Sequence, residues 1–190
     1  MKVHLVGIGG AGMSALARLY LALGHTVSGS DASDSPALRD LATLGATVHV
    51  GHDGAYVQGT DLVVTTSAAP AQTPELVAAR AQGIRLLKHA QALGELFNTQ
   101  RGIAVAGTHG KTTTTSLTGM VLTEAGFDPT IVVGGRVRIL GTNARLGRGD
   151  FLVAEADEYD RSFLELTPDV AVITNVEADH LDCYRDLDEI

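Results

Sequence analysis

Apolar runs and amphipathic stretches alternate along the first half of the chain. An apolar run over residues 3–8 meets a cluster of glycines, and apolar residues then recur at helical spacing over residues 13–23. The rhythm continues with predicted strands at 25–29, 46–50, 61–66 and 84–87, and with predicted helices at 36–44, 74–82 and 89–97. This alternation predicts an α/β fold that begins with a Rossmann-like, doubly wound parallel sheet.

A polar stretch over residues 98–102 interrupts the rhythm and predicts a boundary between two domains, 1–98 and 99–190. The elements predicted after this boundary are a strand at 103–106, a helix that runs to Ala125, an irregular glycine-rich stretch at 134–149, and strands at 151–154 and 170–174. The chain stops at Ile190 without a turn or a cap. We therefore expect the second α/β domain to be only partly present.

The composition is that of an ordinary globular protein, with 45% hydrophobic and 19% charged residues among 190. A net charge of −8 argues against a general basic surface for nucleic acid. Cys183 is the single cysteine, which excludes an internal disulfide and fits a reducing compartment. No leader peptide or membrane span is indicated, so we expect a soluble, cytoplasmic protein with no membrane partner.

Gly7, Gly9 and Gly12 lie between the first predicted strand and the first predicted helix, in the pattern G-x-G-x-x-G. Such a turn lets a diphosphate approach bare backbone, and the helix that follows offers unpaired N–H groups and the positive end of its dipole. Asp31 follows the second strand, at about the offset from which an acidic residue reaches a ribose hydroxyl. Alone, this motif leaves open a nicotinamide dehydrogenase, or a tight turn without a ligand.

A second glycine turn, GTHGKTT at residues 107–113, follows the strand at 103–106 and opens a helix. Backbone N–H groups of such a loop cradle phosphates, Lys111 would reach the β and γ phosphates, and the Thr112 hydroxyl would bind Mg²⁺. Val105 stands where the common Walker A motif has its first glycine, so this P-loop is shorter. A nicotinamide dehydrogenase has no use for this second phosphate site.

Two further side chains are expected at the same sheet edge as the P-loop. Glu155 directly follows a predicted strand, where P-loop proteins commonly place a carboxylate for Mg²⁺. His180 follows the next predicted strand, and the carboxyl ends of parallel strands converge on the edge where doubly wound folds bind ligands. The acids Asp157, Glu158 and Asp160 are as well explained by a solvated loop as by function.

In their order and spacing, these motifs resemble the Mur ligases, and the alanine-adding members of that family match best. The matching segments lie at 4–14, 29–31, 51–52, 66–68, 107–114, 141–147, 155–158, 174–175 and 179–180. The shortened P-loop is itself a trait of the family. Arg161 departs from the pattern, because many relatives have glycine there.

The resemblance implies that the first domain binds UDP-N-acetylmuramate rather than NAD. The implied substrate-binding residues are Gly9, Gly10, Ala11, Gly12, Met13, Ser14, Asp31, His52 and Ser67. It implies that ATP lies on Gly107, Thr108, His109, Gly110, Lys111, Thr112 and Thr113. Thr112 and Glu155 are implied to hold the Mg²⁺ that bridges its phosphates, and His180 a second Mg²⁺. The implied catalytic residues are Lys111, Glu155 and His180.

The implied reaction belongs to peptidoglycan synthesis. The lactyl carboxylate of the sugar is phosphorylated to an acyl phosphate, which the amine of L-alanine attacks with loss of phosphate. Family members also have a longer central ATPase domain and a C-terminal domain that helps to hold the amino acid. We therefore expect that this chain alone does not ligate.

Two alternatives stay open. A recycling ligase, which attaches a whole peptide to the same sugar, shares the P-loop and metal residues, although Gly9 and Gly10 disfavour it. A non-catalytic UDP-sugar-binding module predicts the loss of Lys111, Thr112 or Glu155, and all three are present. The sequence gives no indication of the oligomeric state.

Overall fold

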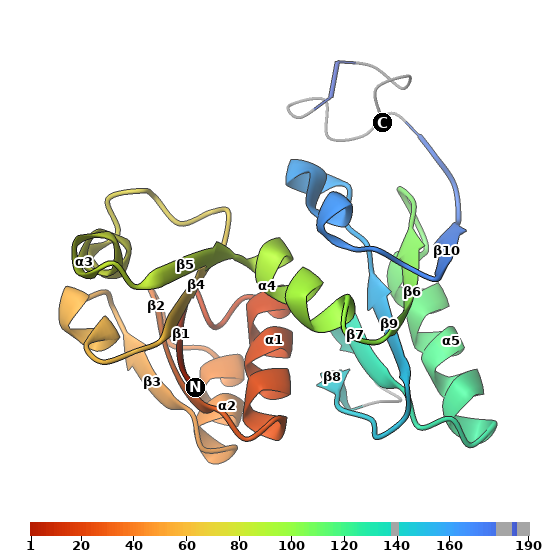
Figure 1. Cartoon of the computed structure of the whole chain (residues 1–190), viewed down its shortest axis with the longest axis horizontal. Helices are drawn as coiled ribbons and strands as arrows, with labels where there is room; N and C mark the ends of the chain where they lie inside the picture. Colours follow the sequence, from red (N-terminus) through yellow and green to blue (C-terminus); the bar gives the residue numbers. More distant parts are fainter. Residues whose placement is uncertain (138–140, 178–183, 186–190) are drawn as a thin grey trace. The chain divides into compact units, whose positions relative to one another are not determined.

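The computed structural model describes residues 1–137, 141–177 and 184–185. The chain forms two compact units, Met1–Ala92 (unit 1) and Leu93–Ile190 (unit 2), each with one five-stranded sheet (Figure 1). The division falls within helix α4 (His89–Phe97), whereas the sequence predicts it just after this helix. In the described part of the chain, no helix is both long and apolar enough to cross a membrane.

The sheet of unit 1 is wholly parallel, with strand order β3-β2-β1-β4-β5. Its strands are β1 (Lys2–Val6), β2 (Thr26–Asp31), β3 (Thr47–Val50), β4 (Leu62–Thr65) and β5 (Arg85–Lys88). Its helices are α1 (Ala11–Ala22), α2 (Pro36–Thr43), α3 (Pro74–Gln82) and the 3-10 helix η1 (Gly54–Val57). The strand order reverses at β1 and β4, the switch point at which Rossmann-like sheets bind ligands. The predicted fold class is thereby confirmed.

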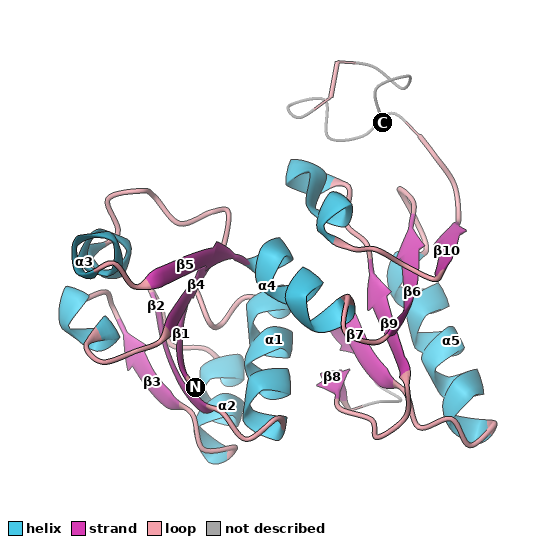
Figure 2. Ribbon diagram, in the orientation of Figure 1, coloured by secondary structure: helices cyan, strands magenta, loops and turns pink. Residues whose placement is uncertain are grey.

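Alternation along β1 divides the core of unit 1 between the two faces of the sheet. Val6 packs with Val63 of β4, Val57 of η1 and Leu76 of α3 in one buried cluster. The opposite face is covered by α1 and α2 (Figure 2). Because successive side chains of a strand point to opposite faces, His4 shares the α3 face with Val6. A histidine is thus placed where the pattern would otherwise put an apolar residue.

Unit 2 has a mixed sheet with strand order β10-β6-β9-β7-β8, in which the described pairs are parallel except β7 with β8. The strands are β6 (Arg101–Ala106), β7 (Thr130–Val137), β8 (Thr142–Arg145), β9 (Phe151–Glu155) and β10 (Val170–Ile173). Helix α5 (Lys111–Glu124) packs against β6, β7 and β9, and the 3-10 helix η2 (Tyr159–Glu165) follows β9. The P-loop lies between β6 and α5.

The stretch at 134–149 is not wholly irregular, so that prediction is wrong in part. β7 continues to Val137, and β8 pairs with it in antiparallel fashion. Gly134 and Gly135 interrupt the apolar run of β7, and glycine inside a strand weakens the sequence signal. The short sequence TNAR of β8 is ordered by its pairing with β7, which no local pattern shows.

Gly102 of β6 is expected to tolerate no side chain. A Cβ there would lie 2.2 Å from the ring of Phe97, which is fully buried. We expect Gly102→Ala to lower the free energy of unfolding by about 1–3 kcal/mol, because the ring must move in a packed core. Gly135→Ala in β7, where no described atom lies within 4 Å of the added Cβ, is the matched control. Equal midpoints of the two variants in urea denaturation would contradict this account.

Candidate functional site

The first glycine turn connects β1 to α1 at the carboxyl edge of the unit 1 sheet. The N–H groups of Gly7 and Ile8 donate to the carbonyl of Ser30 at 2.8 and 3.1 Å, which ties the turn to β2. The N–H of Gly9 donates to Oδ2 of Asp31 at 2.9 Å. The strand, turn and helix that a diphosphate site requires are thus present, and the Asp31 carboxylate already occupies one N–H of the turn.

Helix α1 begins at this turn without a capping side chain. Its N-cap residue is Gly10, which has no side chain that could accept from the first N–H groups of the helix. Met13 and Ser14 are buried, and the Ser14 hydroxyl donates to the carbonyl of Ala11 at 3.0 Å. The start of α1 therefore offers backbone to a ligand, while the side chains of Met13 and Ser14 face the interior.

Asp31, His52 and Ser67 come from three different strand ends. Asp31 ends β2, His52 follows β3 and the exposed Ser67 follows β4. Because the strands are parallel, all three lie at the same edge as the glycine turn. Gly51, just before His52, donates from its N–H to the carbonyl of Asp31 at 2.7 Å. The structure therefore brings these sequence-predicted residues to one edge of unit 1.

Beneath His52 lies a buried polar cluster that the motifs do not reveal. Nδ1 of His52 is 3.0 Å from Oε1 of Glu75 and 3.4 Å from Oγ of Ser30. His4 is fully buried, with its two ring nitrogens 2.9 Å from Oγ of Ser28 and 3.5 Å from Oγ of Ser30. Burial lowers the pKa of His4 to about 4. The available signal is polar residues at inward positions of β1 and β2.

The P-loop of unit 2 packs against the two residues that follow β10, Thr174 and Asn175. Gly107 has φ +128°, and a Cβ there would lie 2.2 Å from Oγ1 of Thr174, so only glycine fits. The N–H of Thr108 donates to the carbonyl of Asn175 at 3.2 Å, and the N–H of His109 donates to Oδ1 of Asn175 at 2.9 Å. Asn175 therefore fixes the shape of the loop, and this role was missing from the sequence-predicted site.

Lys111 at the start of α5 forms a nearly buried ion pair with Glu158. Its Nζ lies 3.0 and 2.9 Å from the two carboxylate oxygens of Glu158, and the two side chains are 15% and 10% exposed. Nζ also donates to the carbonyl of Gly107 at 2.8 Å. Tyr184 donates from its hydroxyl to the carbonyl of Glu158 at 2.6 Å. Glu158, whose role the sequence left open, thus contacts the P-loop lysine directly.

Glu155 and Thr112 lie on elements that flank the P-loop. Glu155 ends β9 beside Val105 of β6, and its Oε1 accepts from the N–H of Gly134 at 2.8 Å. Thr112 is exposed in the first turn of α5. A carboxylate and a hydroxyl are hard oxygen donors, and Mg²⁺ needs few protein ligands because it keeps water and binds phosphate oxygens. These two residues therefore fit Mg²⁺.

Metal ligands beyond this pair are not gathered in the described part of the chain. Its His, Cys, Asp and Glu side chains form no group of three or more that could hold a metal ion. His180, implied as a ligand of a second Mg²⁺, lies outside the described residues.

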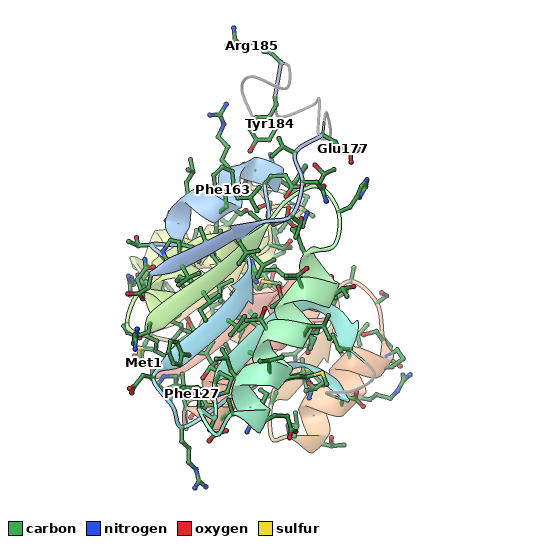
Figure 3. The ribbon with its side chains drawn as sticks, turned by 90° about the vertical axis from the view of Figure 1, so that its right-hand side faces the viewer. Met1, Phe127, Phe163, Glu177, Tyr184 and Arg185 are labelled. Atoms are coloured by element: carbon green, nitrogen blue, oxygen red, sulfur yellow. The ribbon has the colours of Figure 1, made fainter. Side chains whose placement is uncertain are left out.

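A largely apolar cavity of about 320 Å³ adjoins the P-loop. Its lining comes from β6, η2 and β10, with Ala104, Phe163 and Ile173 among its residues, and it reaches Thr108 and Glu158. Phe163, Glu177 and Tyr184 lie at this end of unit 2, and Phe127 lies at the opposite end (Figure 3). The Lys111–Glu158 pair is therefore bordered on one side by apolar surface.

Known proteins match nearly the whole chain. A family model described as Mur ligase family, catalytic domain, matches residues 2–101, and one described as Mur ligase middle domain matches residues 105–190. The chain is 57% identical to UDP-N-acetylmuramate–L-alanine ligase of Laribacter hongkongensis over 96% of its length, and 54% identical to that of Thiobacillus denitrificans over 99%. It spans 39% and 41% of those two proteins, about two fifths of their length.

Solved structures show the same similarity. A crystal structure of UDP-N-acetylmuramate-alanine ligase from Thermotoga maritima has a TM-score of 0.91 at 34% identity, over 98% of this chain and 44% of that one. The UDP-N-acetylmuramate:L-alanyl-γ-D-glutamyl-meso-diaminopimelate ligase from Neisseria meningitides has a TM-score of 0.90 at 35% identity, over 98% and 64%. With two consecutive family models matched and both glycine turns in place, the chain belongs to the Mur ligase family.

Proposed function

We propose that the chain is part of an ATP-dependent ligase that joins L-alanine to the lactyl carboxylate of UDP-N-acetylmuramate. The observation that carries this proposal is the pair of glycine turns, each between a strand and a helix at the carboxyl edge of its own sheet. One turn suits a diphosphate and the other has a P-loop lysine. A ligase that phosphorylates a UDP-sugar needs both, and the names of the curated relatives specify the sugar and the amino acid.

Unit 1 is the proposed site for the UDP-sugar. The diphosphate would lie on the glycine turn at the uncapped start of α1, where backbone N–H groups and the helix dipole favour negative charge. Asp31, His52 and Ser67 would contact the nucleoside or the sugar from the neighbouring strand ends. A phosphate oxygen that takes the N–H of Gly9 would have to replace the Asp31 carboxylate, because that carboxylate holds this N–H here.

Unit 2 is the proposed site for ATP. Residues 107–113 would surround its phosphates, and the Lys111 ammonium would exchange the Glu158 carboxylate for phosphate oxygens. Thr112 and Glu155 would hold Mg²⁺, which when bound neutralises phosphate charge. His180 is proposed as a ligand for a second Mg²⁺.

The proposed reaction needs no protein nucleophile. An oxygen of the lactyl carboxylate attacks the γ-phosphorus of ATP, and the bond to the leaving ADP oxygen breaks. The amine of L-alanine then attacks the acyl carbon, loses a proton, and displaces inorganic phosphate. Lys111 contributes by stabilising negative charge on the transferred phosphoryl group, and the P-loop contributes by holding that group in place.

The recycling ligase remains a second candidate because the Neisseria meningitides structure is nearly as similar as the Thermotoga maritima one. Both names specify UDP-N-acetylmuramate, so the two candidates differ in what they join to this sugar. The alanine-adding reaction is favoured by the curated relatives of that name, which are 54% and 57% identical to this chain.

The experiment that tests the proposal is isothermal titration of the chain with UDP-N-acetylmuramate, with NAD as the control ligand, at fixed salt and Mg²⁺ concentration. We expect heat of binding with the UDP-sugar and none with NAD, because the proposed ligase reaction does not use a nicotinamide cofactor. Binding of NAD without a response to the UDP-sugar would restore the dehydrogenase alternative.

A further inference from the structure

Glu75 is a buried carboxylate to which the proposed ligase chemistry gives no role. It lies in the first turn of α3 and has no exposed surface. Burying an ionised carboxylate is costly unless a partner compensates the charge. The partner here is His52, whose Nδ1 is 3.0 Å from Oε1 of Glu75. A carboxylate whose burial costs free energy therefore contacts one of the residues proposed to bind the UDP-sugar.

Two contacts hold His52 at the carboxyl edge of the unit 1 sheet, one through the backbone of Gly51 and one through the His52 ring. Gly51 before it donates to the carbonyl of Asp31 at 2.7 Å, and the Asp31 carboxylate accepts from Gly9 of the glycine turn at 2.9 Å. The His52 side chain is 29% exposed, while its Nδ1 points at the fully buried Glu75. The part of the ring that solvent reaches is therefore the edge that bears Nε2.

The charge on Glu75 determines which ring nitrogen of His52 carries the proton. Burial raises the pKa of Glu75, but hydrogen bonds from Ser30, from its own backbone N–H and from His52 outweigh burial, so that this pKa lies below its ordinary value. An ionised carboxylate only accepts hydrogen bonds, so Nδ1 of His52 must donate. In the neutral ring, Nε2 then has a lone pair and accepts.

We propose that Glu75 is a positioning residue, which fixes His52 as the Nδ1–H tautomer and so makes Nε2 an acceptor for an N–H or O–H group of the nucleoside or sugar of the bound ligand. The inference rests on the proposed function, because it takes unit 1 to bind the UDP-sugar. Diphosphate oxygens only accept hydrogen bonds at neutral pH, and an Nε2 lone pair would repel them. The N3–H of uracil and the ribose hydroxyls are donors. The hydroxyls and the amide N–H of N-acetylmuramate are donors as well, so His52 recognises the nucleoside or the sugar rather than the diphosphate.

The surroundings of His52 hold its ring in place. Oγ of Ser30 lies 3.4 Å from Nδ1 of His52 and 3.5 Å from Nε2 of His4. On the His4 side of the cluster, the Tyr56 ring lies 6.3 Å from the His4 ring and stacks on His49 with centroids 3.9 Å apart. A purely structural role for Glu75, as an anchor of α3, makes a different prediction. Removing the anchor would lower stability and leave the tautomer of His52 unchanged.

The test compares two variants of the 190-residue chain, Glu75→Met and Glu75→Gln. The glutamine keeps a carbonyl oxygen that can accept from Nδ1–H, whereas methionine has the shape of the side chain without an oxygen acceptor. The ¹⁵N chemical shifts of the His52 ring at pH 8 report its tautomer, and the signals are assigned by their loss in His52→Gln. The affinity for UDP-N-acetylmuramate is measured by titration on the same samples, and thermal unfolding confirms that each variant is folded.

We expect the Nδ1–H form of His52 in the unchanged chain and in Glu75→Gln, and a shift toward the Nε2–H form in Glu75→Met. We expect Glu75→Met to lose about tenfold in affinity for the UDP-sugar, as His52→Gln does, and Glu75→Gln to recover most of it, since tenfold is the value of one ordinary hydrogen bond. An unchanged tautomer in Glu75→Met, or a changed tautomer with unchanged affinity, overturns the proposal.

The failure of the proposed function gives a different result. In that case the unchanged chain does not bind the UDP-sugar at all, whereas the ring signals of His52 still report whether Glu75 sets its tautomer. The ligand part of the proposal is then overturned together with the proposed function.

Discussion

Replacing Lys111 with methionine is expected to weaken ATP binding to unit 2 about a hundredfold, which corresponds to about 3 kcal/mol. The ammonium of Lys111 contacts the P-loop itself, because Nζ donates to the carbonyl of Gly107 at 2.8 Å. Charge-assisted hydrogen bonds to phosphate are stronger than neutral ones. Titration with ATP and Mg²⁺ measures the loss. Lys2→Met, which removes the same charge from an exposed position in unit 1, is the matched control.

The same substitution should also destabilise unit 2, because it removes the ammonium that pairs with the nearly buried Glu158 carboxylate. Removing one partner of a buried ion pair typically costs about 3–5 kcal/mol. The double variant Lys111→Met with Glu158→Gln should regain most of this stability without regaining ATP binding. A double variant that binds ATP normally would contradict the role of Lys111. A single variant as stable as the unchanged chain would contradict the structural role of the pair.

Glu158→Gln alone separates the two roles further. Lys111 then has no carboxylate to leave when phosphate arrives, so ATP affinity should be equal to or higher than that of the unchanged chain. A large loss of affinity would mean that Glu158 itself contacts the nucleotide or its metal.

The elements that could be predicted from the sequence are those whose ends are marked locally. The predicted helices at 74–82 and 89–97 coincide with α3 and α4. For α3 both ends are marked, because Pro74 opens the helix and Gly83 closes it. Strand β4 is a short apolar run between turns, and β5 overlaps the predicted strand at 84–87, whose apolar residues are Ile84, Leu86 and Leu87. β7 and β8 were not predictable, because glycines interrupt one and the other depends on pairing with its neighbour.

The candidate sites were predictable to a similar extent. Both glycine turns have a local motif, and the parallel sheet then places the ends of neighbouring strands beside them. The two contacts between a buried carboxylate and a site residue, Glu158 with Lys111 and Glu75 with His52, do not follow from any motif. Glu158 is 47 residues from Lys111, and Glu75 is 23 residues from His52, so only the fold brings each pair together. An isolated buried acid has the same sequence pattern as an acid in a solvated loop.

Lowering the pH from 7 to 5 is expected to reduce the free energy of unfolding of the chain by about 2 kcal/mol through His4 alone. Burial lowers the pKa of His4 from 6.5 to about 4 in the folded state; the Glu75 carboxylate opposes this effect, and His49 and His52 add to it. Between these two values the unfolded chain binds a proton that the folded chain does not. The stability is therefore fully present above pH 6.5 and is lost progressively as the pH falls toward 4.

The matched variant for this prediction is His4→Gln, which is neutral at every pH and can still hydrogen-bond the hydroxyls of Ser28 and Ser30. Urea denaturation at pH 7 and pH 5 gives the pH-dependent loss for each chain, and only the difference between the two losses belongs to His4. The other groups that act on His4, which are His49 from β3, His52 from the loop after β3 and Glu75 from α3, are the same in both chains, so their contributions cancel to first order. Equal losses in the two chains would mean that the buried cluster opens to water when His4 binds a proton. In that event the ring of His52 would not be held rigidly either, because Ser30 links the two histidines.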